Sequence, residues 1–362
     1  MNQNNYAVIM AGGIGTRFWP MSTTEHPKQF HDILGIGKSL LQLTFDRLNH
    51  LVPEENIYIV TNEIYENQVL EQLKGISKEQ VLLEPMMRNT APCIAYAAFK
   101  IHQQNPRARL IVAPSDHLIT NELEFYKNIE TALKTAEKEQ TLITLGIKPS
   151  RPDTGYGYIQ YLCDVTAENK DLKKVKLFTE KPNLEIAKQF IDSGDFLWNS
   201  GIFIWSSAAI IKAFNSYLPE MHELFYEGSK FYNTADEKEY INKIYPTCQK
   251  ESIDYGIMEK ADNVFVLPVS FGWSDLGTWG SLYTHISKDE NENATVNENT
   301  MFYESSNNIV NVEKGKLAVI QGLDDYIVVD KNNTLLICKK EEEQKIKQFV
   351  QDVRLEKGDE FV

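Results

Sequence analysis

The sequence has few cysteines, no long apolar run and no excess of positive charge, and each absence excludes a class of protein. Its four cysteines, at positions 93, 163, 248 and 338, stand far apart and have neither metal-ligand nor disulfide-framework spacing. No stretch approaches the roughly 20 apolar residues of a membrane span. The N-terminus also lacks a positively charged segment followed by an apolar one. We therefore expect reduced thiols and a cytoplasmic protein.

Positive charge is scarce relative to negative charge. Lys and Arg number 37 and Asp and Glu number 51, which gives a net charge of −14. Such an acidic chain is a poor partner for nucleic acids and for anionic membranes, so we expect neither. Any phosphate ligand must be held by a local basic cluster that acts against the field of the whole protein.

The chain of 362 residues is long enough for roughly two domains of about 150 residues each. In its first half, short apolar runs alternate with helical patterns, which is typical of βαβ units and a largely parallel sheet. We predict an α/β fold with a mixed, mostly parallel sheet, whose ligands bind beyond the carboxyl ends of the strands. The predicted strands in this half are Tyr6–Met10, Asn56–Val60, Val81–Glu84, Arg109–Ala113 and Thr141–Gly146, and the predicted helices are Ser39–Val52, Glu63–Lys74, Thr90–Gln103 and Glu122–Glu139.

A polar, acidic segment at Lys288–Asn299 marks a change of composition. We place a boundary there, with one domain at 1–290 and a small C-terminal domain at 291–362. The latter contains short strand-like runs whose starts lie eight or nine residues apart, which fits either coils of a β-helix or an antiparallel meander. An amphipathic helix is expected at Glu341–Val353. The predicted runs are Ile309–Val312, Leu317–Ile320, Tyr326–Val329 and Leu335–Cys338.

The strongest functional signal is the loop that follows the first predicted strand. Three glycines allow the backbone to approach a ligand closely, and a hydroxyl and a guanidinium follow that suit phosphate. The pattern matches neither a P-loop nor a dinucleotide fingerprint. Lys28, between Pro27 and Gln29, could reach a phosphate held by this loop. The loop residues are Ala11, Gly12, Gly13, Gly15, Thr16 and Arg17.

Two aspartates and one polar loop are further candidates. Asp116, next to Ser115 at the end of a buried strand, and Asp275 in the segment Gly272–Trp279 could share one Mg²⁺ ion, although each could instead cap a helix. Glu84 ends a strand and could face the edge of a purine base. The following Asn89 and Thr90 have the residue types of helix caps as well as of base-binding groups.

Three more segments combine polar groups with flexible backbone and could hold sugar hydroxyls or phosphate, although simple turns are the alternative for each. They contain Gly155 and Tyr156, Glu180 and Lys181, and Asn199. No nucleophile stands in a pattern that would pair it with a base. Positioning and charge neutralisation therefore fit the chain better than covalent catalysis.

As a set, these motifs resemble the family of mannose-1-phosphate guanylyltransferases, also called GDP-mannose pyrophosphorylases, in its short bacterial form. The resemblance covers essentially the whole chain and rests on AGGIGTRFWP, PKQF, EPMMRNTAP, PSDH, DTGYGYI, EKP, LWNSGIF, SIDYGIMEKA and GWSDLGTW. It implies a Rossmann-like nucleotidyltransferase domain followed by a small left-handed β-helix-like domain. It also implies the formation of GDP-mannose and pyrophosphate from GTP and α-D-mannose 1-phosphate with Mg²⁺.

The resemblance also implies roles for individual residues. Gly12, Gly13, Gly15, Thr16 and Arg17 would hold the triphosphate, and Lys28 would help to neutralise it. Asp116 and Asp275 would bind Mg²⁺, and Glu180, Lys181 and Asn199 would hold mannose 1-phosphate. Beside these roles, we predict that the nucleotide also contacts Ala11, Glu84, Asn89, Thr90 and Ser115, and that the sugar phosphate also contacts Gly155 and Tyr156.

Three alternatives remain open at this point. The substrate could be another sugar 1-phosphate or another nucleotide, the chain could be a glycosyltransferase, or it could be an inactive subunit that binds a sugar nucleotide. Asp116 lacks the nearby second aspartate common in metal-dependent glycosyltransferases, and the joint presence of Arg17, Lys28, Asp116 and Asp275 argues against an inactive subunit. The sequence does not fix the oligomeric state, and a homodimer is one option.

Overall fold

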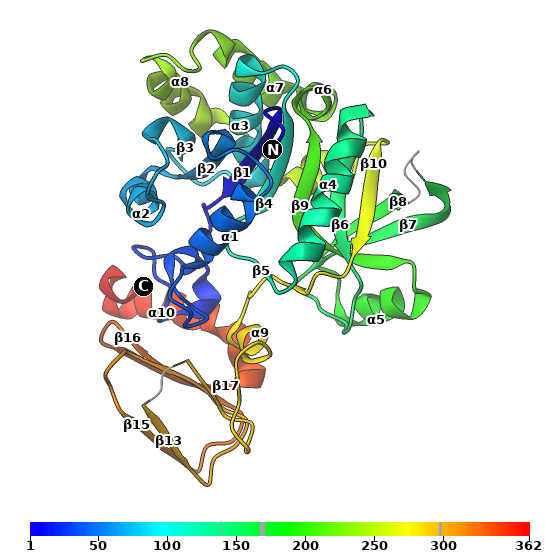
Figure 1. Ribbon diagram of the computed structural model, residues 1–362. Coiled ribbons are helices and arrows are strands. Elements are labelled where there is room, and N and C mark those ends of the chain that lie inside the picture. The colour runs from blue at the N-terminus through cyan, green and yellow to red at the C-terminus, as the bar shows by residue number, and fades with distance from the viewer. Residues whose placement is uncertain (139, 167–170, 297–298) are drawn as a thin grey trace. The chain divides into compact units, whose positions relative to one another are not determined.

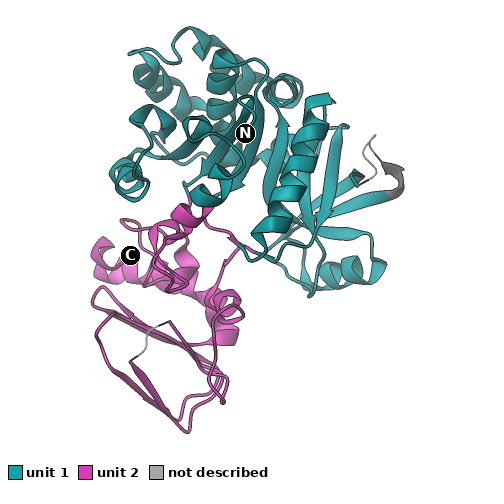
Figure 2. Cartoon of the chain, in the orientation of Figure 1, with its two compact units in different colours: residues 1–12, 45–115, 119–273 teal, residues 13–44, 116–118, 274–362 magenta. Residues whose placement is uncertain are grey.

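The computed structural model describes residues 1–138, 140–166, 171–296 and 299–362 (Figure 1). By its internal contacts, the chain divides into two compact units, neither of which is continuous in sequence (Figure 2). The first unit consists of 1–12, 45–115 and 119–273. The second unit consists of 13–44, 116–118 and 274–362.

The first unit is built on a mixed sheet, as the sequence predicted. Nine strands of the described ranges form it, in the order β3-β2-β1-β4-β9-β6-β10-β8-β7. The strands from β3 to β4 run parallel, as do β6 and β10, whereas β9 runs antiparallel to its neighbours β4, β6 and β7. The strands are β1 (Asn5–Met10), β2 (Ile57–Asn62), β3 (Val81–Glu84), β4 (Arg109–Pro114), β6 (Leu142–Ile147), β7 (Gly157–Thr166), β8 (Lys173–Glu180), β9 (Phe196–Ser206) and β10 (Val264–Val269).

Strand β1 lies at the point where the order of the parallel strands reverses. After β1 the chain adds β2 and β3 on one side and then returns to add β4 on the other. In such sheets, ligands bind in the crevice beyond the carboxyl ends of the strands at this switch point. The glycine loop leaves the sheet at that position, directly after Met10.

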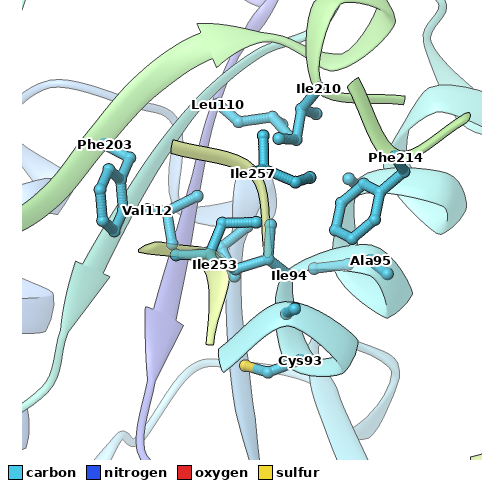
Figure 3. Packing of buried hydrophobic residues seen from close by; sticks show 14 of the residues in the cluster. Cys93, Ile94, Ala95, Leu110, Val112, Phe203, Ile210, Phe214, Ile253 and Ile257 are labelled. Carbon is cyan, nitrogen blue, oxygen red and sulfur yellow. The ribbon is translucent and has the colours of Figure 1, made fainter. Parts of the chain in front are cut away.

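Helices cover both faces of this sheet. Tyr6 and Val8 of β1 belong to a large apolar cluster with α3 and α6, while Ala7 and Ile9 must face the other side because side chains alternate along a strand. Figure 3 shows part of this cluster, to which Ile94 of α3, Phe214 of α6 and Val112 of β4 all contribute. The helices of the first unit are α2 (Glu66–Gln72), α3 (Thr90–Gln104), α4 (Glu122–Lys138), α5 (Leu184–Ser193), α6 (Ser207–Tyr217), α7 (Pro219–Glu227) and α8 (Glu237–Ile244), and α1 (Leu40–Asn49) runs from the second unit into the first.

The second unit contains parallel coils rather than a meander. Ile309 pairs with Ile327, and Thr300 pairs with Ala318, in parallel ladders that connect successive coils. Among the strand ladders of this unit in the described ranges, β16 with β17 is the antiparallel one, and an isolated antiparallel bridge joins Lys288 to Ala294. The structure therefore decides the alternative left open by the sequence in favour of a β-helix-like unit. Its strands are β12 (Ala294–Thr295), β13 (Thr300–Tyr303), β14 (Ile309–Val312), β15 (Ala318–Gln321), β16 (Tyr326–Lys331) and β17 (Thr334–Lys339).

A second apolar cluster holds this unit together. Phe18 and Trp19 from the segment after the glycine loop pack with Trp279 of α9 (Trp279–Tyr283) and with Ile346 and Val350 of α10 (Ile346–Lys357). The Trp19 indole also donates a hydrogen bond of 2.6 Å to the Phe361 carbonyl oxygen. The second unit therefore includes an N-terminal segment as well as the C-terminal coils.

Where an element was predicted, it lies close to the observed one. No element was predicted for β12, β13, α7 or α8, and the last helix was predicted to begin at Glu341, where the structure has a 3-10 helix over Lys340–Lys345 before α10. Two short strands, β5 (Leu118–Ile119) and β11 (Trp273–Ser274), pair with each other. None of the helices in the described ranges has both the length and the apolar character needed to cross a lipid bilayer.

Candidate active site

The glycine loop fits tightly around Lys28 in the second unit. Gly15 has a φ of +72°, a left-handed conformation that side chains disfavour. A Cβ atom at Gly15 would also lie only 2.5 Å from the Cβ of Lys28. The Lys28 N–H donates to the Ile14 carbonyl oxygen at 3.3 Å, so the two segments run side by side. Glycine is therefore required at position 15 for both conformation and space.

Lys28 brings together three of the predicted residues. Its side chain is only 3% exposed, and its ammonium donates to Asp116 Oδ2 at 2.7 Å and to the Asp275 backbone oxygen at 2.8 Å. These partners lie 88 and 247 positions away in the sequence. Burial alone would raise the pKa of Asp116, but the nearby Lys28 and, to a smaller extent, His117 lower it below its usual value. Asp116 is therefore held as a carboxylate.

Neither aspartate caps a helix, although the sequence allowed that reading for both. Helix α4 is capped by Asn121, whose side chain accepts the Glu124 N–H at 3.1 Å. Helix α9 is capped by Thr278 in a reciprocal capping box with Ser281. Asp275 instead accepts the Gly277 N–H at 2.9 Å, within its own turn. Both carboxyl groups therefore occupy positions that helix capping does not explain.

The donor chemistry of this group fits Mg²⁺ bound together with a substrate. Mg²⁺ prefers oxygen ligands and is typically held by one or two carboxylates plus phosphates of the substrate. Asp116 and Asp275 supply two such groups from segments joined by Lys28. Within the described residues, three or more acidic, histidine or cysteine side chains do not gather into a closed metal site. The arrangement thus suits a metal that arrives with its phosphate ligand.

Thr16 and Arg17 form a short 3-10 helix with Phe18 directly after Gly15. Arg17 is half-buried and makes no ion pair with any residue in the described parts of the chain. Its guanidinium therefore has the hydrogen-bond donors left that a phosphate needs. Gly13 has open space around it, so its role is not one of packing.

In the first unit, Glu84 lies beneath Gly12 at the carboxyl edge of the sheet. Its side chain is buried, Oε1 accepts the Tyr245 hydroxyl, and Oε2 would lie 3.2 Å from a Cβ atom at Gly12. Burial raises the pKa of Glu84 to about 7, and the hydrogen bond from Tyr245 opposes this only in part. A buried carboxyl group with such a perturbed pKa, at the ligand-binding edge of a sheet, is typical of a functional site.

The other nucleotide-site candidates of the first unit make hydrogen bonds within that unit. Asn89 caps α3 by accepting the Thr90 N–H at 2.9 Å, and the Thr90 hydroxyl accepts the Ile253 N–H at 2.9 Å. Ser115 donates its N–H to the Met10 carbonyl oxygen at 3.0 Å, which joins the ends of β4 and β1. The structural reading of Asn89 and Thr90 as a helix start is thus confirmed, and their contact with a nucleotide stays a prediction.

Asn199 is the centre of a third group of polar residues, also in the first unit. Its Oδ1 accepts the Thr144 hydroxyl at 3.0 Å and the Gly201 N–H at 3.2 Å, and its Nδ2 donates to Asp254 Oδ1 at 2.7 Å. Burial and the negative charge of Glu180 raise the pKa of Asp254 to about 6, against the effect of the Asn199 hydrogen bond.

Glu180 and Lys181 form an ion pair at the end of β8. Oε2 of Glu180 lies where a side chain of Gly157 would begin, and the same point is 3.5 Å from the Asn199 Cβ, so the three residues are neighbours. Of the other predicted residues, Gly155 donates its N–H to Asp153 Oδ1 at 2.8 Å, and the Tyr156 ring packs edge-on against Trp198, 5.0 Å away. The structure therefore gathers the sugar-site candidates within one unit.

Four residues of these groups were not predicted from the sequence. Tyr245, Gly157, Asp254 and Thr144 received no role, although Gly157 and Asp254 lie in segments that had been singled out. Tyr245 follows α8 in an ordinary sequence context, and only its contact with Glu84 reveals it.

Comparison with known proteins agrees with this arrangement. Residues 6–292 match the family model described as nucleotidyl transferase, and residues 298–353 match the MannoseP isomerase/GMP-like beta-helix domain. The mannose-1-phosphate guanylyltransferase of Salmonella montevideo is 36% identical to this chain over 363 residues, which cover 98% of this chain and 75% of that protein. The chain belongs to the mannose-1-phosphate guanylyltransferase family of nucleotidyl transferases. It is thus an enzyme of the nucleotidyltransferase kind.

Other members and solved structures support the family assignment. The alginate biosynthesis protein AlgA of Pseudomonas aeruginosa is 33% identical over 96% of this chain and 71% of its own length. A crystal structure titled mannose-1-phosphate geranyltransferase, from Thermus thermophilus, matches with a TM-score of 0.87 and 29% identity, over 97% of this chain and 100% of that one. A structure titled mannose-6-phosphate isomerase from Helicobacter pylori matches 75% of this chain and 99% of its own with a TM-score of 0.61 and 29% identity. The family's fold thus extends over both units.

Proposed function

We propose that the protein transfers GMP from GTP to α-D-mannose 1-phosphate and releases pyrophosphate, which makes GDP-mannose. The observation that carries the proposal is the contact of one buried ammonium, Lys28, with the Asp116 carboxylate and with the backbone oxygen of Asp275, beside the glycine loop. This arrangement supplies positive charge and carboxylates in a chain whose relatives are named mannose-1-phosphate guanylyltransferase.

The reaction is a substitution at the α-phosphorus of GTP. A phosphate oxygen of mannose 1-phosphate forms the new P–O bond, and the bond to pyrophosphate breaks on the opposite side. The main obstacle is the approach of two anions, because two unit charges about 4 Å apart repel by roughly 1 kcal/mol in water and about 4 kcal/mol at an effective dielectric of 20. Arg17, Lys28 and Lys181 offset this repulsion and orient the reacting groups.

Asp116 and Asp275 would hold Mg²⁺. When bound, the ion neutralises charge on the phosphates and on the leaving group. The lowered pKa of Asp116 favours this role, since a carboxylate ligand must be ionised. Lys28 forms an ion pair with that same carboxylate, which keeps it ionised and in place.

The remaining residues divide into nucleotide and sugar contacts. Backbone N–H groups of the glycine loop and the Arg17 side chain bind the triphosphate. The Glu84 carboxylate accepts hydrogen bonds from the base, because guanine carries two adjacent N–H donors on one edge. Lys181 binds the sugar phosphate, and Glu180 and Asn199 bind sugar hydroxyls. The further nucleotide contacts are Ala11, Gly12, Gly13, Gly15, Thr16, Asn89, Thr90 and Ser115, and the further sugar contacts are Gly155 and Tyr156. We assign substrate binding to residues 1–290 and a supporting β-helix-like domain to residues 291–362.

The test is a turnover assay that follows pyrophosphate release from GTP, mannose 1-phosphate and Mg²⁺. We expect GDP-mannose as the product, and at least a 100-fold loss of turnover for Asp116→Ala and for Asp275→Ala, with circular dichroism unchanged. Asp324→Ala, which removes an exposed carboxylate that only accepts bonds from Ser306 and Asn307, is the matched control and should keep full activity.

Two results would contradict the proposal in different ways. Near-normal turnover of either aspartate variant would remove that residue from the metal site. Faster turnover with another sugar 1-phosphate or another nucleoside triphosphate, in a panel under the same conditions, would replace the proposed substrates.

A further inference from the structure

Asp254 stands in an unusual position for a carboxyl group. It begins a π-helix at Asp254–Met258, a rare backbone form that is frequent at functional sites. It is partly buried, and within the described ranges it forms no ion pair. Its negative neighbour Glu180 makes its ionisation harder still. A partly buried carboxyl group of this kind lowers the stability of the folded protein, so we expect Asp254 to have a functional role.

The contacts of Asn199 fix the orientation of its carboxamide. The Gly201 N–H can only donate, so the side-chain atom 3.2 Å away must be the carbonyl oxygen. An ionised Asp254 can only accept, so the atom 2.7 Å from its Oδ1 must be the NH₂ group. In a flipped amide, the NH₂ group would face the Gly201 N–H, donor against donor, and the carbonyl oxygen would face Asp254 Oδ1, acceptor against acceptor. The two contacts therefore agree on one orientation.

In that orientation, and among the residues that the structure describes, Asn199 has one N–H left to donate. Its oxygen is occupied by Thr144 and Gly201, and the other N–H is occupied by Asp254. Glu180, on the other side of Gly157, offers only acceptor oxygens when ionised. A sugar hydroxyl can accept from an amide and donate to a carboxylate at the same time, so the pair suits a polyol ligand.

We infer that Asp254 is a positioning residue for the sugar phosphate: it holds the Asn199 carboxamide so that its remaining N–H donates to a ligand oxygen. This inference rests on the proposed function, because that proposal assigns Asn199 to the sugar subsite. Asp254 itself acts through Asn199 and need not touch the substrate. Without Asp254, the Gly201 N–H is the main remaining contact that selects the orientation of the amide, so the amide turns more readily. A turned amide presents an oxygen where the ligand needs a donor.

The test is a double-mutant cycle between positions 254 and 199, read as the KM for mannose 1-phosphate. Asp254→Ala should raise this KM by about threefold to tenfold, the range expected when a hydrogen bond to an uncharged sugar hydroxyl is lost. The KM for GTP should stay within about twofold of the wild-type value. In an Asn199→Ala background, Asp254→Ala should have no further effect beyond about twofold.

Two further variants make the result specific. Asp254→Asn keeps an acceptor oxygen and should restore most of the affinity for sugar phosphate, and it also serves if Asp254→Ala does not fold. Asp195→Ala is the matched control, because it removes a carboxylate that accepts an amide N–H, from Gln160, at the same 2.7 Å in the same unit. It should leave the KM for sugar phosphate unchanged.

Additive effects in the cycle would overturn the inference, because they would show that Asp254 does not act through Asn199. An equal rise in the KM for GTP and for sugar phosphate would also overturn it, since it would indicate a general structural defect. The wild-type enzyme separates this failure from that of the proposed function: if it does not make GDP-mannose, the function is wrong, and if it does while the cycle is additive, only the role of Asp254 is wrong.

Discussion

The buried carboxyl group of Glu84 gives the protein a pH-dependent stability that one substitution should remove. The pKa of Glu84 is raised from 4.5 to about 7 by burial. Between these values the unfolded chain loses the proton while the folded protein keeps it, so stability falls as the pH rises. The slope is about 1.4 kcal/mol per pH unit, which amounts to about 3 kcal/mol between pH 4.5 and pH 7. Above pH 7 this contribution no longer changes.

Glu84→Gln isolates the charge from the contacts. The amide oxygen can still accept the Tyr245 hydroxyl, and the side chain keeps its size. Unfolding by urea at intervals from pH 4 to pH 9 gives the free energy of unfolding of both proteins. We expect the variant to gain about 3 kcal/mol relative to the wild type on going from pH 4 to pH 8, because it does not have to ionise a buried group. Glu239→Gln, in which an exposed carboxyl group on α8 changes, is the control.

A difference between the two proteins that stays constant over this pH range would refute the reasoning, because it would mean that Glu84 titrates alike in the folded and unfolded states. The same variant bears on function. If Glu84 accepts hydrogen bonds from the base, the KM for GTP should rise in Glu84→Gln even where its stability is higher. A stabilised variant that binds GTP less well would show that the buried charge serves binding rather than folding.

Two further predictions concern the glycine loop and its lysine. Gly15→Ala places a side chain at a φ of +72° and against Lys28, so it should lower the free energy of unfolding by about 1–3 kcal/mol and reduce turnover, whereas Gly13→Ala, which meets open space, should leave stability unchanged in the same urea titration. Lys28→Met removes the charge that lowers the pKa of Asp116. The difference in free energy of unfolding between the wild type and Lys28→Met should be greatest above pH 4 and should shrink as the pH falls below 4, because the native ion pair contributes only while Asp116 is ionised. A difference that stays constant between pH 3 and pH 7 would contradict this account.

Much of the secondary structure could be predicted because it depends on local patterns. Strand β3 was predicted at its observed bounds, Val81–Glu84, and α3 was predicted to within one residue of its end at Gln104. In both cases a run of apolar residues is bounded by polar residues or by a helix cap. The spacing of apolar residues along a segment indicates whether it forms a helix or a strand and which face is buried, and this spacing does not depend on the rest of the chain.

Pairing between distant segments could not be read in this way. The strand-like runs after residue 300 fitted a meander as well as a β-helix, and only the pairing of Ile309 with Ile327 excludes the meander. The sequence of a strand does not indicate which strand it pairs with or in which direction, because side chains alternate in the same way in parallel and antiparallel ladders.

For the functional groups, the order of amino acids alone identified which residues could carry the chemistry: a glycine loop, a lysine and several acids of suitable type. The folded chain was needed to establish that Lys28 binds the Asp116 carboxylate and the Asp275 backbone oxygen, that neither aspartate caps a helix of the described ranges, and that Asp254 accepts a hydrogen bond from Asn199. An ion pair or a hydrogen bond depends on distances of about 3 Å between side chains, and the chain path that sets these distances is a property of the whole fold.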